Sequence, residues 1–134
     1  LRVKLRFLAQ DNAKRQAVAG QYDARLSGSS LTIPRTYPGH THVYHQYVIR
    51  TRHRDELKEF LEKSSVGSLI HYPVPIHLQP AYRDCRLAQG GLTETERICC
   101  EILSLPIHPY LTADEVGRVA DAILSWLQQE PQPK

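Results

Sequence analysis

Apolar residues recur at helical spacing toward both ends of the chain. Between Leu1 and Leu26 they recur three or four residues apart in two stretches, which predicts a long helix over residues 1–26. Toward the other end, Thr112 and Glu115 have the spacing of a capping box at the start of a helix. We expect the apolar face of this last helix to be buried against a core. That face consists of Val116, Val119, Ala120, Ile123, Leu124 and Leu127.

Two shorter helices are predicted between these two. One covers residues 55–63, and Gly67 would suit its C-terminal cap. The other begins at Thr93, which has Glu96 three residues later as a second capping box, and ends at residues 104–106. The shorter helix also has an apolar stripe that we expect to be buried. The stripe is formed by Leu57, Phe60 and Leu61.

β-Branched and aromatic residues indicate where strands form. Residues 41–51 are the best candidate, and their apolar residues fall on both faces, so we expect a strand that is covered on both sides. Residues 68–72 are a second candidate, and a last strand is expected around residues 105–108. This order of elements leaves room for a small sheet backed by helices.

The most distinctive segment is residues 71–82, which we call the proline ribbon. It contains three prolines, two histidines and two tyrosines, so it should be a stiff, non-helical platform for polar side chains. His71 and Tyr72 lie where the second strand enters the ribbon. From the residues alone, a role in the core and a role in a site are equally open for these two. Apolar neighbours on both sides of His77 favour a core role for that residue.

Composition restricts the possible classes of protein. A chain of 134 residues with 41% hydrophobic residues, 23% charged residues and a net charge of +3 is typical of one soluble globular domain. No apolar run approaches membrane-spanning length, no signal-peptide pattern opens the chain, and nothing requires nucleic acid. The basic run at residues 50–54 is followed at once by Asp55 and Glu56. We interpret it as a solvated turn, with a phosphate-contacting patch as the lesser alternative.

The cysteines and histidines are the residues that could bind a metal or act as a nucleophile. Three unpaired cysteines indicate reduced thiols in a cytoplasmic protein, with Cys99 and Cys100 as small buried residues of a helix. A zinc site from His40, His42 and a cysteine is a minor alternative, because no ligand motif with the usual spacing occurs. Cys85 lacks an evident activating base for nucleophilic catalysis. We therefore predict no metal ligand and no catalytic residue in this chain.

The start of the sequence predicts a fragment of a longer protein. The chain has no methionine, and it begins inside a helical pattern without a capping residue. Removal of a covering domain would expose apolar side chains on that helix, so self-association of the chain is expected. These side chains are Leu1, Leu5, Phe7 and Leu8.

Several short motifs follow one another in a recognisable order. They are residues 12–22, 42–50, 54–57, 67–82, Glu96, 103–106 and 111–116. Together they resemble the small C-terminal domain of the DegT/DnrJ/StrS family of sugar aminotransferases, which are fold type I enzymes that use pyridoxal phosphate (PLP). This resemblance implies an α/β fold of the α+β type, with a small, mainly antiparallel sheet of about three strands packed against helices. It also implies a connecting helix over 1–26, a domain over 27–130 and a disordered tail over 131–134.

The resemblance also implies a function. Family members transfer an amino group from glutamate to a keto group on a nucleotide-linked sugar, through a PLP Schiff base on a lysine. In that arrangement His71 and Tyr72 would face the substrate, and His77 would be a weaker candidate for substrate binding. The end of the ribbon is most similar to members that act on 3-keto-6-deoxy sugars.

The same resemblance limits what the chain can do alone. The family's PLP-binding residues and catalytic lysine belong to a large domain, and the lysines here match no such motif. PLP is thus expected in a parent enzyme, which would be a homodimer, but not on this chain, which should be inactive in isolation. The competing interpretation is a stand-alone sugar-nucleotide-binding or protein-interaction module derived from such an enzyme.

Overall fold

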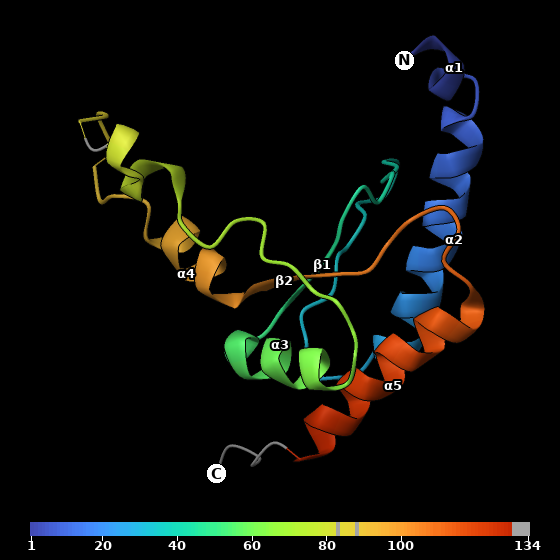
Figure 1. Cartoon of the computed structure of the whole chain (residues 1–134). Helices are drawn as coiled ribbons and strands as arrows, with labels where there is room; N and C mark the ends of the chain where they lie inside the picture. The colour runs from blue at the N-terminus through green and yellow to red at the C-terminus, as the bar shows by residue number, and fades with distance from the viewer. Residues whose placement is uncertain (83, 88, 130–134) are drawn as a thin grey trace.

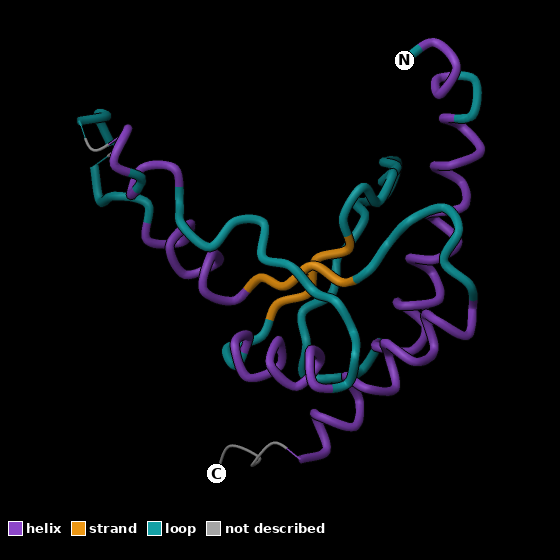
Figure 2. The backbone as a smooth tube through the Cα atoms, in the orientation of Figure 1, coloured by secondary structure: helices purple, strands orange, loops and turns teal. Residues whose placement is uncertain are grey.

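The computed structural model describes residues 1–82, 84–87 and 89–129 (Figure 1). The first two helices lie along one side of the molecule, the strands lie near its middle, and the ribbon and the next helix project on the opposite side (Figures 1 and 2). The elements are α1 (Arg2–Leu5), α2 (Leu8–Leu26), β1 (Tyr47–Arg50), α3 (Arg54–Lys63), the 3-10 turns η1 (Ile76–Leu78) and η2 (Pro80–Tyr82), α4 (Thr93–Glu101), β2 (Ile102–Leu105) and α5 (Ala113–Gln129).

A small antiparallel sheet lies at the centre of the fold. β1 and β2 pair with Tyr47 opposite Leu105 and Ile49 opposite Leu103. Single bridges add Thr32 beside Arg50 and Leu69 beside Ser104, one on each edge of the pair. The predicted fold class, a small antiparallel sheet packed against helices, is confirmed, although the sheet has two regular strands instead of about three.

The hydrophobic core joins one face of the sheet to α2, α3 and α5. α2 packs against α5, and α3 packs against both α5 and β2. Burial of these apolar side chains is the main favourable contribution to folding. The largest fully buried side chains are Tyr22, Leu26, Tyr47, Ile49, Leu57, Leu61, Leu103, Val116 and Ile123.

The last helix forms as predicted. The Thr112 hydroxyl accepts a hydrogen bond from the Glu115 amide at 3.3 Å, and Glu115 Oε2 accepts one from the Thr112 amide at 2.8 Å. This reciprocal pair is the predicted capping box. Val116 and Ile123 of the predicted apolar face are fully buried, so the assignment of that face is confirmed.

The N-terminal helix is interrupted, which the periodicity did not predict. α1 ends at Leu5, and α2 begins only at Leu8, after a turn through Arg6 and Phe7. α1 has no buried residue, so burial in the core does not favour one continuous helix there.

The predicted strand over residues 41–51 is wrong in length, because β1 contains only Tyr47–Arg50. Tyr44 has a φ of +48°, a left-handed conformation that interrupts regular strand geometry. The Tyr44 amide also donates to His42 Nδ1 at 3.0 Å, which closes a local turn. Residues 41–46 are therefore loop.

The other predicted strands are also corrected. Residues 68–72 contribute one bridge at Leu69, and two prolines soon after it lack the amide donors needed to extend the pairing. The last strand is Ile102–Leu105 and not 105–108, because α4 already ends at Glu101. The proline ribbon is not wholly extended either, since it contains η1 and η2.

Two predictions about helix ends and charges are wrong. Ser65, with a φ of +60°, takes the left-handed position after α3, so Gly67 is not its cap.

Within the basic run, Arg54 is only 8% exposed and is not part of a solvated turn. Its Nη1 donates to the backbone oxygens of Cys99 and Ile102, at 3.1 and 3.3 Å. These oxygens lie where α4 joins β2, so the two hydrogen bonds of Arg54 connect that junction to the start of α3.

Within the described residues, no helix is both long and apolar enough to cross a membrane. The predicted tail over 131–134 lies outside the described residues.

The second half of α2 belongs to the core through Val18, Ala19 and Tyr22, which are buried.

The central strand pair leads to a first prediction. Leu103→Ala should lower the free energy of unfolding by about 2–5 kcal/mol, because it leaves a cavity beside Ile49 in a fully buried position. Chemical denaturation followed by circular dichroism measures this change. Val74→Ala, at a site that is 47% exposed, is the matched control and should change stability by less than about 1 kcal/mol. Equal losses in the two variants would contradict the assigned core.

Candidate functional site

Ser104 of β2 positions the first predicted site residue. Its amide donates to the Leu69 oxygen at 2.7 Å, and its own oxygen accepts from the Leu69 amide at 3.2 Å. The Ser104 hydroxyl then hydrogen-bonds to Nδ1 of His71 at 2.8 Å. Ser104 is 6% exposed, so this hydroxyl is a fixed anchor. The arrangement leaves Nε2 of His71 without a hydrogen-bond partner in the part of the chain that the structure describes.

His71 lines a cavity of about 530 Å³ beside the end of the sheet. Its size lies within the range of small-molecule pockets. The polar groups come from three segments that are far apart in sequence, and the rest of the lining consists of Gly67 and the apolar residues Leu69, Leu105, Pro106 and Ile107. The lining residues are His45, Gln46, Gly67, Ser68, Leu69, His71, Ser104, Leu105, Pro106 and Ile107.

Tyr72 lies outside this cavity. Its side chain is 70% exposed, and its ring meets the His71 ring edge-on at a centroid distance of 5.6 Å. Tyr72 can thus contact a ligand held by His71 only from the open side of the cavity.

His77 is separated from the other two predicted residues. Its side chain is 6% exposed, and its Nε2 donates to Oε1 of Glu96 in α4 at 3.0 Å. This hydrogen bond connects the ribbon to α4. It also explains why the predicted capping box at Thr93 is wrong: the Glu96 carboxylate bonds to His77, and the helix has Leu92 as its N-cap without a side-chain cap.

Sequence reasoning missed four polar residues of this cavity as site candidates: His45, Gln46, Ser68 and Ser104. His45 had been assigned to a strand, but the loop before β1 brings it to the cavity. Ser104 had been placed at the end of a helix. Ser104 is a polar residue between the apolar Leu103 and Leu105. This alternation shows that its side chain faces away from the core only once the segment is known to be the strand β2.

Two buried tyrosines lie in the core near the cavity, and both of their hydroxyls are hydrogen-bonded. The Tyr22 hydroxyl donates to the Pro106 oxygen at 2.9 Å, and the Tyr47 hydroxyl donates to Oδ1 of Asp23 at 2.6 Å. Burial raises the pKa of both phenols well above the ordinary value, and the hydrogen bond to Asp23 raises the pKa of Tyr47 further. Both groups remain protonated at neutral pH.

Metal and thiol chemistry receive no support from the geometry. Among the described residues, no three histidine, cysteine or acidic side chains converge as metal ligands, so His40, His42 and a cysteine are not brought together. Cys85 is exposed and free. The expected burial of the neighbouring pair is wrong, because Cys99 is half-buried and Cys100 is exposed on the outer surface of α4.

The described lysines do not fit a covalent PLP site. None lines the cavity beside His71. Lys14 lies over the Tyr110 ring, with its Nζ 5.1 Å from the centroid, and Lys63 pairs with Glu59 at 2.8 Å. Lys58 lies 3.9 Å from Glu62 along the same helix. These contacts are those of ordinary surface lysines.

Known structures of aminotransferases have the same fold. The structure of S. venezuelae DesV in complex with a ketimine intermediate superimposes with a TM-score of 0.91 at 37% identity, over 97% of this chain and 35% of that one. A DegT DnrJ EryC1 StrS aminotransferase from Brucella abortus gives a TM-score of 0.89 at 33% identity, over 94% of this chain and 34% of that one. The fold is therefore that of an aminotransferase domain.

Sequence comparison identifies the family. A dTDP-3-amino-3,4,6-trideoxy-alpha-D-glucose transaminase from Streptomyces venezuelae is 38% identical over 133 residues, which are 98% of this chain and 35% of the relative. The erythromycin biosynthesis sensory transduction protein EryC1 from Saccharopolyspora erythraea is 41% identical over 89% of this chain and 33% of its own length. The model of the DegT/DnrJ/EryC1/StrS aminotransferase family matches residues 1–124, so the chain belongs to this family. It spans about a third of the length of these relatives.

The buried tyrosines give a pH prediction. In the unfolded chain the phenols of Tyr22 and Tyr47 ionise at about pH 10, whereas in the folded chain both phenols are still protonated at that pH. Their contribution to stability is thus complete below about pH 10 and is lost as the pH rises above it. Denaturant unfolding at about pH 8 and about pH 11 should show this loss, and Tyr47→Phe should reduce it. Spectrophotometric titration of all seven tyrosines near pH 10 in a still-folded chain would contradict the assignment.

Proposed function

We propose that this chain is the small C-terminal domain of a PLP-dependent nucleotide-sugar aminotransferase of the cytoplasm, and that it forms one wall of the substrate pocket. The family match over residues 1–124 is the observation on which the proposal depends. The chain spans about a third of the length of its relatives, and the proposed organisation of that third is a connecting helix over 1–26 followed by a domain over 27–130. Glutamate is the proposed amino donor.

The proposed sugar is a nucleotide-linked 3-keto-6-deoxyhexose. Two relatives support this choice: the S. venezuelae transaminase is named for a 3-amino-3,4,6-trideoxy sugar, and one from Aneurinibacillus thermoaerophilus, 33% identical, for a 3-amino-3,6-dideoxy sugar. Both names place the amino group at carbon 3 of a dTDP-linked sugar.

In this proposal His71 orients the sugar by hydrogen bonding. Ser104 holds Nδ1 of the ring, which leaves Nε2 to bond with a hydroxyl or keto oxygen of a bound sugar. A buried anchor of this kind keeps the ring in one orientation and lowers the entropy cost of binding. Tyr72 would cover the sugar from the open side. His77, through Glu96, would act by holding the ribbon in place.

PLP, held by a large domain, would supply the aldehyde that carries the amino group between donor and acceptor. The lysines described in this chain do not fit that role, so the domain alone should not catalyse transamination. Its own contribution is to bind and orient the sugar and to exclude water from one side of the pocket.

The function is tested by kinetics in the whole protein that contains this chain. His71→Ala should lower kcat/KM for a dTDP-linked 3-keto-6-deoxy sugar by about 10- to 100-fold, because one substrate hydrogen bond and its anchor are lost, while the cofactor absorbance is unchanged. His53→Ala is the control: among the described residues, that ring is exposed and hydrogen-bonds only to Glu56, at 2.7 Å. An unchanged kcat/KM in His71→Ala would refute the assigned role.

Two further measurements complete this experiment. The isolated chain mixed with PLP should give no imine absorbance band; a stoichiometric band that borohydride fixes to one lysine would refute the fragment proposal. The gene upstream of Leu1 separates the alternatives, since an in-frame large domain with a lysine motif supports the enzyme. A start site there would instead support a stand-alone sugar-nucleotide-binding module, which the preformed cavity beside His71 makes feasible.

We further propose a homodimeric parent enzyme and self-association of the chain through its N-terminal helices. Leu1 is 98% exposed, Leu5 54% and Phe7 53%. Burial of these apolar side chains between two copies of the chain would favour association. Light scattering should show a mass above that of the monomer at high concentration. Replacing Leu5 and Phe7 by Ser should restore the monomer, while Val74→Ser should not. A monomeric wild-type chain at high concentration would contradict this proposal.

A further inference from the structure

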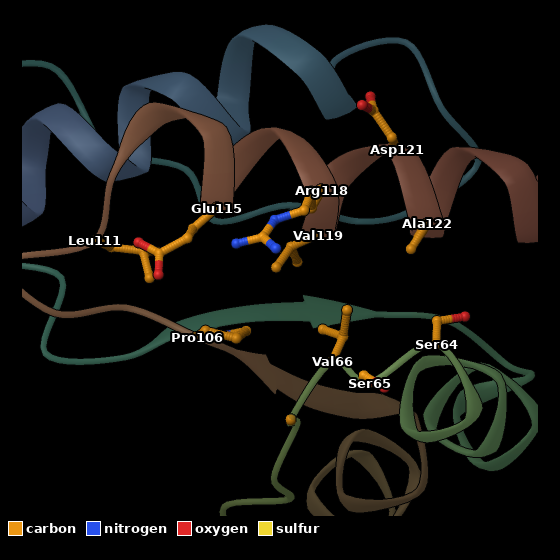
Figure 3. Close-up of a pocket in the computed structure, with 11 residues that line it drawn as sticks. Ser64, Ser65, Val66, Pro106, Leu111, Glu115, Arg118, Val119, Asp121 and Ala122 are labelled. Atoms are coloured by element: carbon orange, nitrogen blue, oxygen red, sulfur yellow. The ribbon is translucent and has the colours of Figure 1, made fainter.

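A second cavity lies between α5 and the segment that follows α3 (Figure 3). Its volume is about 530 Å³, and it adjoins the cavity beside His71, because Gly67 and Pro106 line both. The lining residues are Ser64, Ser65, Val66, Gly67, Pro106, Leu111, Glu115, Arg118, Val119, Asp121 and Ala122.

Three polar side chains in this cavity are available to a ligand. Arg118 extends from α5 on the side that faces Ser65 and Val66, as Figure 3 shows. Within the described part of the chain, its guanidinium makes no hydrogen bond and no ion pair. The hydroxyls of Ser64 and Ser65, on the opposite wall, are likewise without hydrogen bonds among the described residues. All three side chains are exposed at the mouth of the cavity, where the Arg118 guanidinium can pair with a carboxylate.

The two acidic residues of the lining are engaged elsewhere. The Asp121 carboxylate pairs with Arg25 of α2 at 3.3 Å, and Figure 3 shows it pointing away from the cavity. Oε2 of Glu115 accepts hydrogen bonds from the amide and the hydroxyl of Thr112, at 2.8 and 2.7 Å. These bonds keep the pKa of Glu115 below its usual range, so the carboxylate is charged at neutral pH. Its negative charge beside Arg118 favours a monoanion over a dianion.

Apolar side chains form the rest of the cavity wall. Val66 and Pro106 lie on one side, and Leu111, Val119 and Ala122 on the other. Val119 is only 6% exposed, so this part of the wall is fixed by the core. A ligand with a flat apolar body would bury its surface here while its charged group reaches Arg118.

We propose that this second cavity binds a small organic monoanion, in which a carboxylate pairs with Arg118 and an apolar body packs on Val66 and Val119. The site differs from the proposed sugar site, because it contains neither His71 nor any residue of the proline ribbon, although the two cavities share Gly67 and Pro106.

The experiment is a titration of the chain followed by ¹H–¹⁵N NMR, with benzoate as the probe. Saturable shifts are expected at residues 64–67 and 115–122. Benzamide, which is neutral and has the same shape, should bind at least about tenfold more weakly, because the charge-assisted hydrogen bonds are lost. Phenyl phosphate should also bind more weakly than benzoate, because its second charge faces Glu115. Tighter binding of phenyl phosphate would overturn the assignment of a carboxylate ligand.

Two variants test the residues themselves. Arg118→Gln should weaken benzoate binding about tenfold, whereas Arg52→Gln, which removes one exposed positive charge elsewhere, should leave it unchanged. Ala122→Leu keeps a good helix former and fills the cavity, so it should abolish binding while the circular dichroism spectrum stays the same. Absence of saturable shifts, shifts confined to other segments, or equal losses in both arginine variants would overturn the proposal.

Discussion

The rest of the structure depends on the antiparallel pairing of β1 with β2. With Ile49 opposite Leu103, one face of the pair is buried in the core, and Ser104 is directed to the other face. A shift of one residue would move Ser104 into the core and Leu103 out of it, so burial of the apolar face enforces the register. The register therefore determines where the hydroxyl that anchors His71 lies.

Two side-chain contacts then connect the proline ribbon to this sheet and to α4. His71 is bonded to Ser104 at one end, and His77 is bonded to Glu96 further along. Between them the ribbon carries exposed apolar side chains, including Tyr72 and Ile76. A segment that is held at two points and exposes apolar side chains is consistent with the pocket wall that we propose.

Much of the local structure was predictable. The capping box of Thr112 and Glu115 and the apolar face of α5 were predicted correctly, because both signals lie within a few residues of sequence. The resemblance to the aminotransferase family was confirmed as well. The strand predicted over residues 41–51 does form at Tyr47–Arg50, but residues 41–46 are loop, because β-propensity does not reveal that Tyr44 adopts a positive φ. The pattern at Thr93 and Glu96 is also that of a capping box, yet a residue 19 positions away binds the carboxylate.

The sequence by itself determined which segments form helices, which of their faces are apolar, and to which family the motifs belong. Tertiary structure alone decided the partners of the polar side chains: Arg54 with the backbone oxygens of Cys99 and Ile102, and His71 with Ser104. The physical reason is that periodicity reports burial along one segment, whereas a hydrogen bond across 33 or more residues depends on how separate segments pack. Both cavities are products of that packing, since each is lined by segments that meet only in the folded chain.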